Sequence, residues 1–108
     1  MQDQQQQECF TISDLQQLVT QSPDQVNIID VRTPEEYAEN HIPGAINIQV
    51  SELESRTTGL SKENIIITAC SKGGGRSVLG AVILKQSGFS KASFLCGGTL
   101  GWFALSSK

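Results

Sequence analysis

Short runs of β-branched residues alternate along the chain with segments that have helical spacing. The runs at residues 26–31 (VNIIDV) and 64–69 (NIIITA) predict buried strands, and shorter strands are expected at 10–12, 45–48 and 92–95. Strands that alternate with helices predict an α/β fold built on a mainly parallel sheet.

Capping residues mark where the intervening helices begin. Ser13 with Gln16, and Thr33 with Glu36, have the spacing of a capping box, in which each side chain bonds the other residue's backbone N–H. The segment after Ser77 is apolar nearly all round, which predicts a helix covered on most sides. The expected helices span residues 13–20, 33–40, 77–86, a short stretch from Ser51 and the region around Trp102.

Length and charge then limit the function classes. A chain of 108 residues is one domain and can bury a core without disulfides or metal. The net charge of −3 gives no general attraction to nucleic acid or to an anionic membrane, and no apolar run reaches the ~18 residues of a membrane span. We expect a disordered tail at residues 1–7, a globular domain at 8–108 and a monomer.

The cysteine pattern argues against a disulfide framework. Cys9, Cys70 and Cys96 are odd in number and widely spaced, which favours free thiols in a reducing compartment. The cytoplasm is therefore expected, with the periplasm as the alternative if an export signal was removed. His41 is the single histidine and no C-x-x-C pair exists, so neither a metal nor another cofactor is expected.

The strand at 64–69 runs directly into a cysteine, a glycine-rich loop and a helix. Glycines adopt backbone conformations that let successive N–H groups converge on an anion, and the helix adds its positive N-terminal end. Cys70 in this position should ionise readily and act as the nucleophile. The substrate-binding residues expected around it are Ser71, Lys72, Gly73, Gly74, Gly75 and Arg76.

The surrounding residues indicate which chemistry the thiolate performs. His41 is far along the chain, so a Cys–His pair for acyl transfer is not expected. Lys72 and Arg76 would attract a small anion such as thiosulfate, whose sulfite group leaves without a strong general acid. Attack on the outer sulfur would give a Cys70 persulfide, which cyanide or a thiol, small or on an acceptor protein, would then unload.

Structural roles are expected for the remaining polar and aromatic residues. Asp30 and Arg32 are interpreted as an ion pair at a strand end or as a cap, and His41 as a hydrogen-bonding residue at a turn. Trp102 is interpreted as part of the core, with a place at the mouth of the pocket as the alternative. Cys9 is expected to be inert. Cys96 is interpreted as a small apolar residue, with a resolving thiol beside Cys70 as the alternative hypothesis.

Several motifs in the same order resemble the rhodanese family over residues 8–106. Each is a short run whose neighbours in this chain also match the family's order. They are Asp30-Val31-Arg32, Glu35-Glu36-Tyr37, His41-Ile42-Pro43-Gly44-Ala45, Cys70 through Ser77, and Gly97-Gly98 followed by Trp102.

The resemblance implies a five-stranded, mainly parallel sheet flanked by helices on both faces. It also implies that Cys70 carries sulfur inside an amide ring formed by residues 71–76. One feature departs from the usual single-domain pattern, because five residues rather than four separate Cys70 from Arg76. That length resembles arsenate reductases and cell-cycle phosphatases of the same fold, although these usually have histidine where this chain has Ala69.

Three functions stay open at this point. The first is a thiosulfate sulfurtransferase, favoured by Ala69 and by the triple glycine with Lys72. The second is an arsenate reductase or phosphatase that uses the loop from Cys70 to Arg76 as an oxyanion cradle. The third is a non-catalytic sulfur-carrier module that accepts persulfide from a partner.

Overall fold

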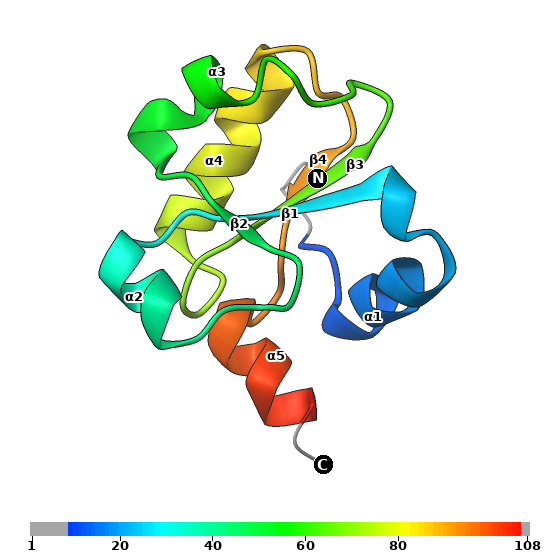
Figure 1. Cartoon of the computed structure of the whole chain (residues 1–108), viewed down its shortest axis with the longest axis vertical. Helices are drawn as coiled ribbons and strands as arrows, with labels where there is room; N and C mark the ends of the chain where they lie inside the picture. The colour runs from blue at the N-terminus through cyan, green and yellow to red at the C-terminus, as the bar shows by residue number, and fades with distance from the viewer. Residues whose placement is uncertain (1–8, 107–108) are drawn as a thin grey trace, which may run out of the picture.

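The computed structural model describes residues 9–106, so the predicted tail at residues 1–7 lies outside the described part of the chain. The described residues form one parallel sheet with strand order β2-β1-β3-β4 and helices on both faces (Figure 1). The strands are β1 (Val26–Asp30), β2 (Ile46–Asn47), β3 (Ile65–Ala69) and β4 (Ala92–Phe94). The helices are α1 (Ile12–Gln21), α2 (Pro34–Glu39), α3 (Leu53–Arg56), α4 (Gly75–Gln86) and α5 (Gly98–Ser106), with 3-10 turns η2 (Pro23–Gln25) and η3 (Val50–Glu52).

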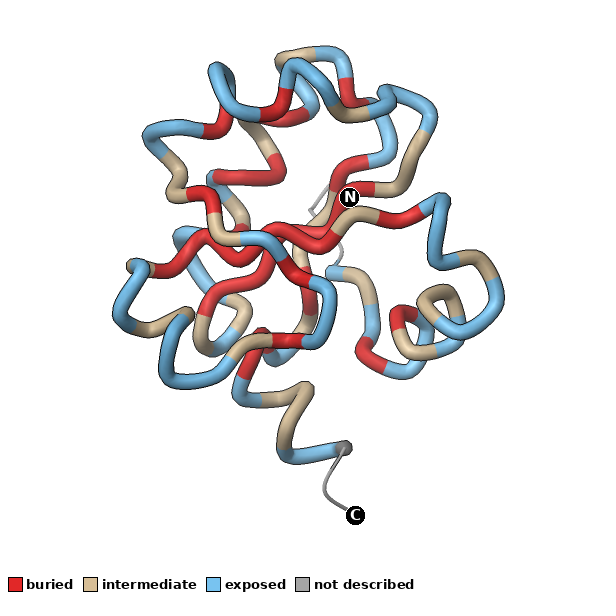
Figure 2. The backbone as a smooth tube through the Cα atoms, viewed as in Figure 1, coloured by how far each residue is buried: buried red, intermediate tan, exposed pale blue. Residues whose placement is uncertain are grey.

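The two faces of the sheet carry separate cores because side chains alternate along each strand. Ile28 and Ile67 pack in one cluster with residues of α1, and Trp102 of α5 packs against it. Ile29 and Ile66 point the other way, into a cluster shared with α3 and α4. Figure 2 shows the buried segments concentrated along the strands between these helical layers.

The predicted fifth strand is wrong. Only Phe10 pairs beside the sheet, through an isolated parallel bridge to Leu95. Thr11 already caps α1, since its side chain accepts a hydrogen bond of 3.1 Å from the Asp14 backbone N–H. The helix therefore begins at Ile12 rather than at Ser13, and it takes up residue 12 of the predicted strand.

The predicted capping box of α2 is confirmed. The Glu36 backbone N–H donates to the Thr33 hydroxyl across 3.2 Å, and the Glu36 carboxylate accepts the Thr33 backbone N–H across 2.9 Å. Pro34 is the first helical residue, where its missing N–H costs nothing. This local arrangement fixes the direction in which the Glu36 carboxylate points.

The predicted cover of α4 holds for five of its six apolar residues, which are buried or half-buried, but not for Leu79. The buried face of the helix consists mainly of small residues, and Leu79 on another face is 51% exposed. Gly80 explains how closely the helix approaches the sheet, because a Cβ there would lie 3.3 Å from both Leu53 Cδ1 and Thr68 Cγ2. The buried residues of the helix are Ser77, Gly80, Ala81 and Leu84.

The expectation that the chain has no disulfide is also wrong. Cys9 and Cys96 are joined by a disulfide with their Cα atoms 5.0 Å apart, so neither is a free thiol. The parallel bridge between Phe10 and Leu95 holds the two segments side by side, and the Cys96 backbone N–H donates to the carbonyl of Phe10, the residue after Cys9. Of the three cysteines, all of which lie within residues 9–106, Cys70 is the free one.

Two further features concern the described residues as a whole. No helix between residues 9 and 106 has the length and apolar character that a membrane span requires. In the same part of the chain, His, Cys, Asp and Glu side chains form no group of three or more that could hold a metal ion.

Candidate active site

Cys70 is the first residue after β3, at the carboxyl edge of the sheet. Parallel α/β sheets form their sites at this edge, beyond the strand ends. Strand alternation places its side chain on the same face as Ile66, in the cluster that also contains Val31 and Leu84 of α4. The residue is only 4% exposed, so its sulfur lies beneath the loop rather than on the surface.

The loop that follows reverses the chain into α4. Gly73 has φ +81°, a left-handed conformation that glycine adopts without steric cost. Gly74 precedes the helix, and its carbonyl accepts the backbone N–H groups of Ser77 (3.1 Å) and Val78 (3.2 Å). The helix therefore begins at Gly75, two residues earlier than predicted, and its first free N–H groups lie at the site.

The Cys70 thiol is surrounded by hydrogen-bonding groups. Its Sγ lies 3.2 Å from the Ser77 hydroxyl oxygen and 3.6 Å from the Gly74 carbonyl oxygen. Burial raises the pKa of the thiol, but hydrogen bonds from the Ser77 side chain and from the backbone N–H groups of Ser77, Gly74 and Gly73 outweigh it. The net pKa is below its usual value, so the loop stabilises the thiolate.

Ser77 is a site residue that the sequence analysis did not select. It is completely buried, and beside the neutral Cys70 thiol its hydroxyl donates to the Gly74 carbonyl across 2.9 Å and accepts the thiol proton. Once Cys70 is ionised, the single hydroxyl proton can turn to the sulfur instead. The Ser77 carbonyl accepts the Thr68 hydroxyl of β3 across 2.7 Å. Ser77 therefore ties the strand, the loop and the helix together around the sulfur. Its position directly after Arg76 in the motif was the available signal.

Arg76 forms an ion pair with a residue of another element. Its Nη1 lies 3.0 Å from Oε1 of Glu36, the residue that completes the α2 capping box. The hydrogen bond from Arg76 is the main reason that the pKa of Glu36 is lowered from 4.5 to about 2, and the same contact raises the pKa of Arg76. The spacing of Thr33 and Glu36 predicts capping alone, since nothing local connects Glu36 to a residue 40 positions away.

The other predicted binding residues form the exposed rim of the loop. Ser71 is half-buried, whereas Lys72, Gly74 and Gly75 are exposed. Lys72 therefore lies at the surface, although it is two positions along the chain from Cys70, whose sulfur is buried. Residues 71–74 form the loop after Cys70, while Gly75 and Arg76 begin α4, where Glu36 pairs with Arg76.

Asp30 and Arg32 have the structural role that was predicted. Arg32 Nε donates to Asp30 Oδ1 across 3.0 Å and Nη2 donates to Oδ2 across 2.9 Å, with both residues buried. Arg32 Nη2 also donates to the Asn40 carbonyl, and Asn47 Nδ2 donates to the Asp30 carbonyl. The pair therefore fastens the end of β1 to Asn40, which follows α2, and Asn47 of β2 bonds the backbone of the same strand end.

His41 and Tyr37 brace the turn after α2. Their rings are stacked with centroids 3.7 Å apart, and His41 Nδ1 lies 2.8 Å from the Tyr37 carbonyl. The Tyr37 hydroxyl donates to the Ala45 carbonyl across 2.6 Å. The structural interpretation of His41 is thus confirmed, and the histidine has no hydrogen bond to Cys70 among the described contacts.

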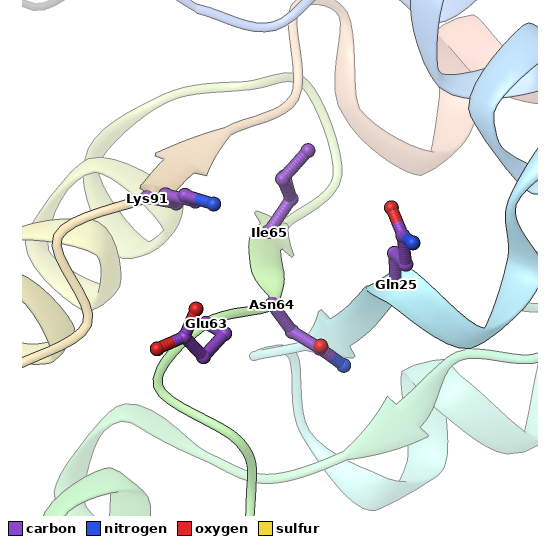
Figure 3. Close-up of a pocket in the computed structure, with 5 residues that line it drawn as sticks. All are labelled: Gln25, Glu63, Asn64, Ile65 and Lys91. Atoms are coloured by element: carbon purple, nitrogen blue, oxygen red, sulfur yellow. The ribbon is translucent and has the colours of Figure 1, made fainter.

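Two cavities differ in their relation to the site. One of about 300 Å³ opens beside Arg76 and Leu79, and is completed by Val31, Thr33, Gln49, Val50 and Ser51. Another cavity, of about 310 Å³, lies where β1 and β3 begin (Figure 3). Cys70 lies at the opposite end of β3. It is lined by Gln25, Glu63, Asn64, Ile65 and Lys91, none of which is a thiol or a hydroxyl residue. The reactive edge is therefore the one at Cys70.

A buried cysteine at the head of a helix, followed by a glycine-rich loop, matches a known family. The model of the rhodanese-like domain matches residues 11–105 of this chain. The chain belongs to the rhodanese-like domain family. The predicted resemblance to rhodaneses and the α/β fold with helices on both faces are thereby confirmed.

Curated relatives and solved structures agree with this membership. The chain is 37% identical over 81 residues to "Putative sulfur carrier protein YrkF" of Bacillus subtilis, covering 75% of this chain and 43% of that protein's length. It is 30% identical to "Sulfurtransferase" of Allochromatium vinosum over 71% of each chain. The BH2092 protein of Bacillus halodurans has a similar structure, with a TM-score of 0.82 and 33% identity over 91% of this chain and 72% of that one.

Proposed function

We propose that this rhodanese-family protein is a sulfurtransferase in which Cys70 carries sulfane sulfur as a persulfide. One observation carries the proposal. The Cys70 sulfur is buried beside the Ser77 hydroxyl and receives backbone N–H groups of Gly73, Gly74 and Ser77, which lower the pKa of the thiol. Such a ring of donors stabilises an anionic sulfur and is suited to both the thiolate and the persulfide.

The reaction balances in two steps without a cofactor. The Cys70 thiolate attacks the outer sulfur of thiosulfate, an S–S bond forms to Cys70, and the S–S bond to the sulfonate breaks, releasing sulfite. A nucleophile such as cyanide then attacks the terminal sulfur and leaves as thiocyanate, which restores the thiolate. Neither step needs a general acid, in keeping with the absence of a hydrogen bond from His41 to Cys70 among the described contacts.

The charged residues at the rim support an anionic donor. Lys72 is exposed, and Arg76 presents a guanidinium whose Nη1 is occupied by Glu36. Both can attract thiosulfate or a persulfide anion to a site in an otherwise acidic chain. Acceptors in this proposal are cyanide, small thiols or a cysteine on an acceptor protein.

The test loads the protein with thiosulfate and measures the mass of the intact chain. We expect a gain of one sulfur atom on Cys70, followed by release of thiocyanate when cyanide is added. A Cys70→Ser variant should show neither signal. Loading without catalytic turnover would support the sulfur-carrier reading instead, and hydrolysis of an aryl phosphate without sulfur loading would support an oxyanion enzyme.

The Cys9–Cys96 disulfide is relevant to the cellular compartment in which the protein resides. Disulfides persist in oxidising compartments and are rare in the cytosol. The Cys9–Cys96 bond therefore favours an oxidising compartment such as the periplasm over the predicted cytoplasm. Thiol counting on protein trapped with an alkylating agent in the producing cells would decide, because the cytoplasmic reading requires three reactive thiols.

A further inference from the structure

The segment after β4 packs directly on the backbone of the catalytic loop. We refer to residues 95–99 as the clasp. The Thr99 N–H donates to the Cys70 carbonyl across 2.8 Å, and the adjoining Leu100 N–H donates to the Ser71 carbonyl across 3.0 Å. The clasp thus holds the two residues at which the catalytic loop begins.

The backbones of the clasp and of the catalytic loop lie too close together to admit a side chain at Gly98 or Gly73. A Cβ on Gly98 would overlap the Cys70 carbonyl oxygen and lie 2.7 Å from both Gly73 N and Ser71 O. A Cβ on Gly73 would lie 2.8 Å from Gly97 N and 2.9 Å from Leu95 O. The two glycine-containing segments therefore fit against each other backbone to backbone, and a shift of one displaces the other.

Cys96 is where the clasp is fixed to the rest of the chain. Its backbone N–H donates to the Phe10 carbonyl across 2.9 Å, and its side chain is bonded to Cys9. Gly97 and Gly98 follow at once with φ of +75° and +61°. Because glycine has the largest conformational freedom of any residue, this pair would be mobile without a fixed neighbour.

We propose that the Cys9–Cys96 disulfide is a positioning element of the sulfur-transfer site. By fixing the first half of the clasp, it holds the clasp against the loop from Cys70 to Gly74 and keeps the loop's N–H groups directed at the sulfur. Preorganised donors stabilise an anion more strongly than donors that must first be ordered. The inference builds on the proposed function, which supplies the anion that the loop is positioned to hold.

A thiol count comes first. Under denaturing conditions without reductant, the wild-type chain should show one reactive thiol, and three would overturn the proposal. The main test uses the double variant Cys9→Ser/Cys96→Ser, in which Cys70 is again the single thiol. Its ionisation is followed by the pH dependence of alkylation with iodoacetamide, a measurement that does not require sulfur transfer.

We expect the pKa of the Cys70 thiol to rise by about one unit in the double variant, which lowers the thiolate fraction about tenfold at acidic pH. Sulfur loading from thiosulfate, measured at a pH below the titration midpoints of both proteins, should fall by a similar factor. The control is Phe89→Leu, which perturbs a buried side chain that follows α4 at the other end from the catalytic loop. An unchanged titration in the double variant, or an equal change in Phe89→Leu, would overturn the proposal.

A second measurement applies if the double variant does not fold. Wild-type protein is reduced with a phosphine under native conditions, and amide exchange is compared before and after. Faster exchange confined to Thr99, Leu100 and the catalytic loop supports the clasp, whereas uniform or unchanged exchange overturns it. If wild-type protein acquires no sulfur, the proposed function fails, while the titration and the exchange still decide the role of the disulfide.

Discussion

Glu36 and Arg76, which lie 40 positions apart, form an ion pair of 3.0 Å that connects the start of α2 to the start of the catalytic helix α4. The same Glu36 carboxylate accepts the Thr33 backbone N–H, so one side chain completes a helix cap and restrains the arginine of the active-site loop. The pair is the direct side-chain link between these two elements among the described ion pairs.

Replacing Glu36 by Gln should remove the ion pair while keeping the cap, since glutamine also serves in a capping box. Both side chains are more than a third exposed, so solvent screening limits the loss to about 1 kcal/mol, or about 5 °C in Tm. The pKa of Glu36 is lowered to about 2, so this contribution is complete above about pH 4.5 and is lost as the pH falls through about 2. Thermal melts at pH 7, 4 and 2 test this.

A matched control for that prediction exists on α3. Glu52 and Arg56 form an exposed i,i+4 pair of 3.1 Å, and Glu52→Gln should cost only about 0.3–0.5 kcal/mol. Equal losses in both variants at pH 7, or a loss in Glu36→Gln that persists at pH 2, would contradict the assignment.

The Ser77→Ala variant should raise the pKa of the Cys70 thiol. The hydroxyl lies 3.2 Å from the sulfur, and a hydrogen bond to a charged group contributes about 1.5–3 kcal/mol, which corresponds to about 1–2 pKa units. Alkylation of Cys70 should slow about tenfold or more at neutral pH and recover in alkaline solution. Ser87→Ala is the control, since that hydroxyl donates to Ile83 at the other end of α4. Superimposable profiles for wild type and Ser77→Ala would refute the role.

The Gly98→Ala variant tests how closely the clasp approaches the loop. Alanine would have to adopt φ +61° and would overlap the backbone of residues 70–73, so we expect a loss of about 2–4 kcal/mol in the free energy of unfolding. Gly59→Ala should change it by less than about 0.5 kcal/mol, because no atom lies within 4 Å of the added Cβ. Urea unfolding of both variants is the measurement, and similar midpoints would contradict the packing described.

The Asp30→Asn variant should leave the buried Arg32 guanidinium without its counter-charge. Removing one partner of a buried ion pair lowers the free energy of unfolding by about 3–5 kcal/mol, whereas replacing both partners by apolar residues often leaves it unchanged. We therefore expect Asp30→Asn to shift the urea midpoint strongly and Asp30→Leu/Arg32→Met to recover much of the loss. A midpoint for Asp30→Asn within about 1 kcal/mol of wild type would show that the pair contributes little.

Local sequence signals were sufficient for much of the fold and for the nucleophile. The β-branched runs predicted β1 and β3 to within one residue, and the box of Thr33 and Glu36 predicted α2. Cys70 was recognisable because the strand, the glycines and the helix that shape its surroundings are contiguous in sequence. These are interactions between near neighbours, which a linear pattern encodes.

What the sequence analysis missed depends on contacts between distant residues. The disulfide joins positions separated by 87 residues, whose segments lie side by side through the pairing of Phe10 with Leu95. The tie from Arg76 to Glu36 is equally non-local. The exposure of Leu79 on α4 was missed because an all-round apolar sequence does not reveal which side of the helix the sheet covers.

The covalent link between Cys9 and Cys96 also determines how the molecule would respond to tension. It closes a ring that contains all four strands and helices α1 to α4, and leaves α5 outside. A force applied between residue 9 and the end of α5 would pass across the sulfur bridge and extend only the stretch beyond Cys96. After reduction, the same force would act on the whole sheet. In a single-molecule experiment, the gain in contour length on unfolding would therefore increase from the short segment after Cys96 to nearly the full chain.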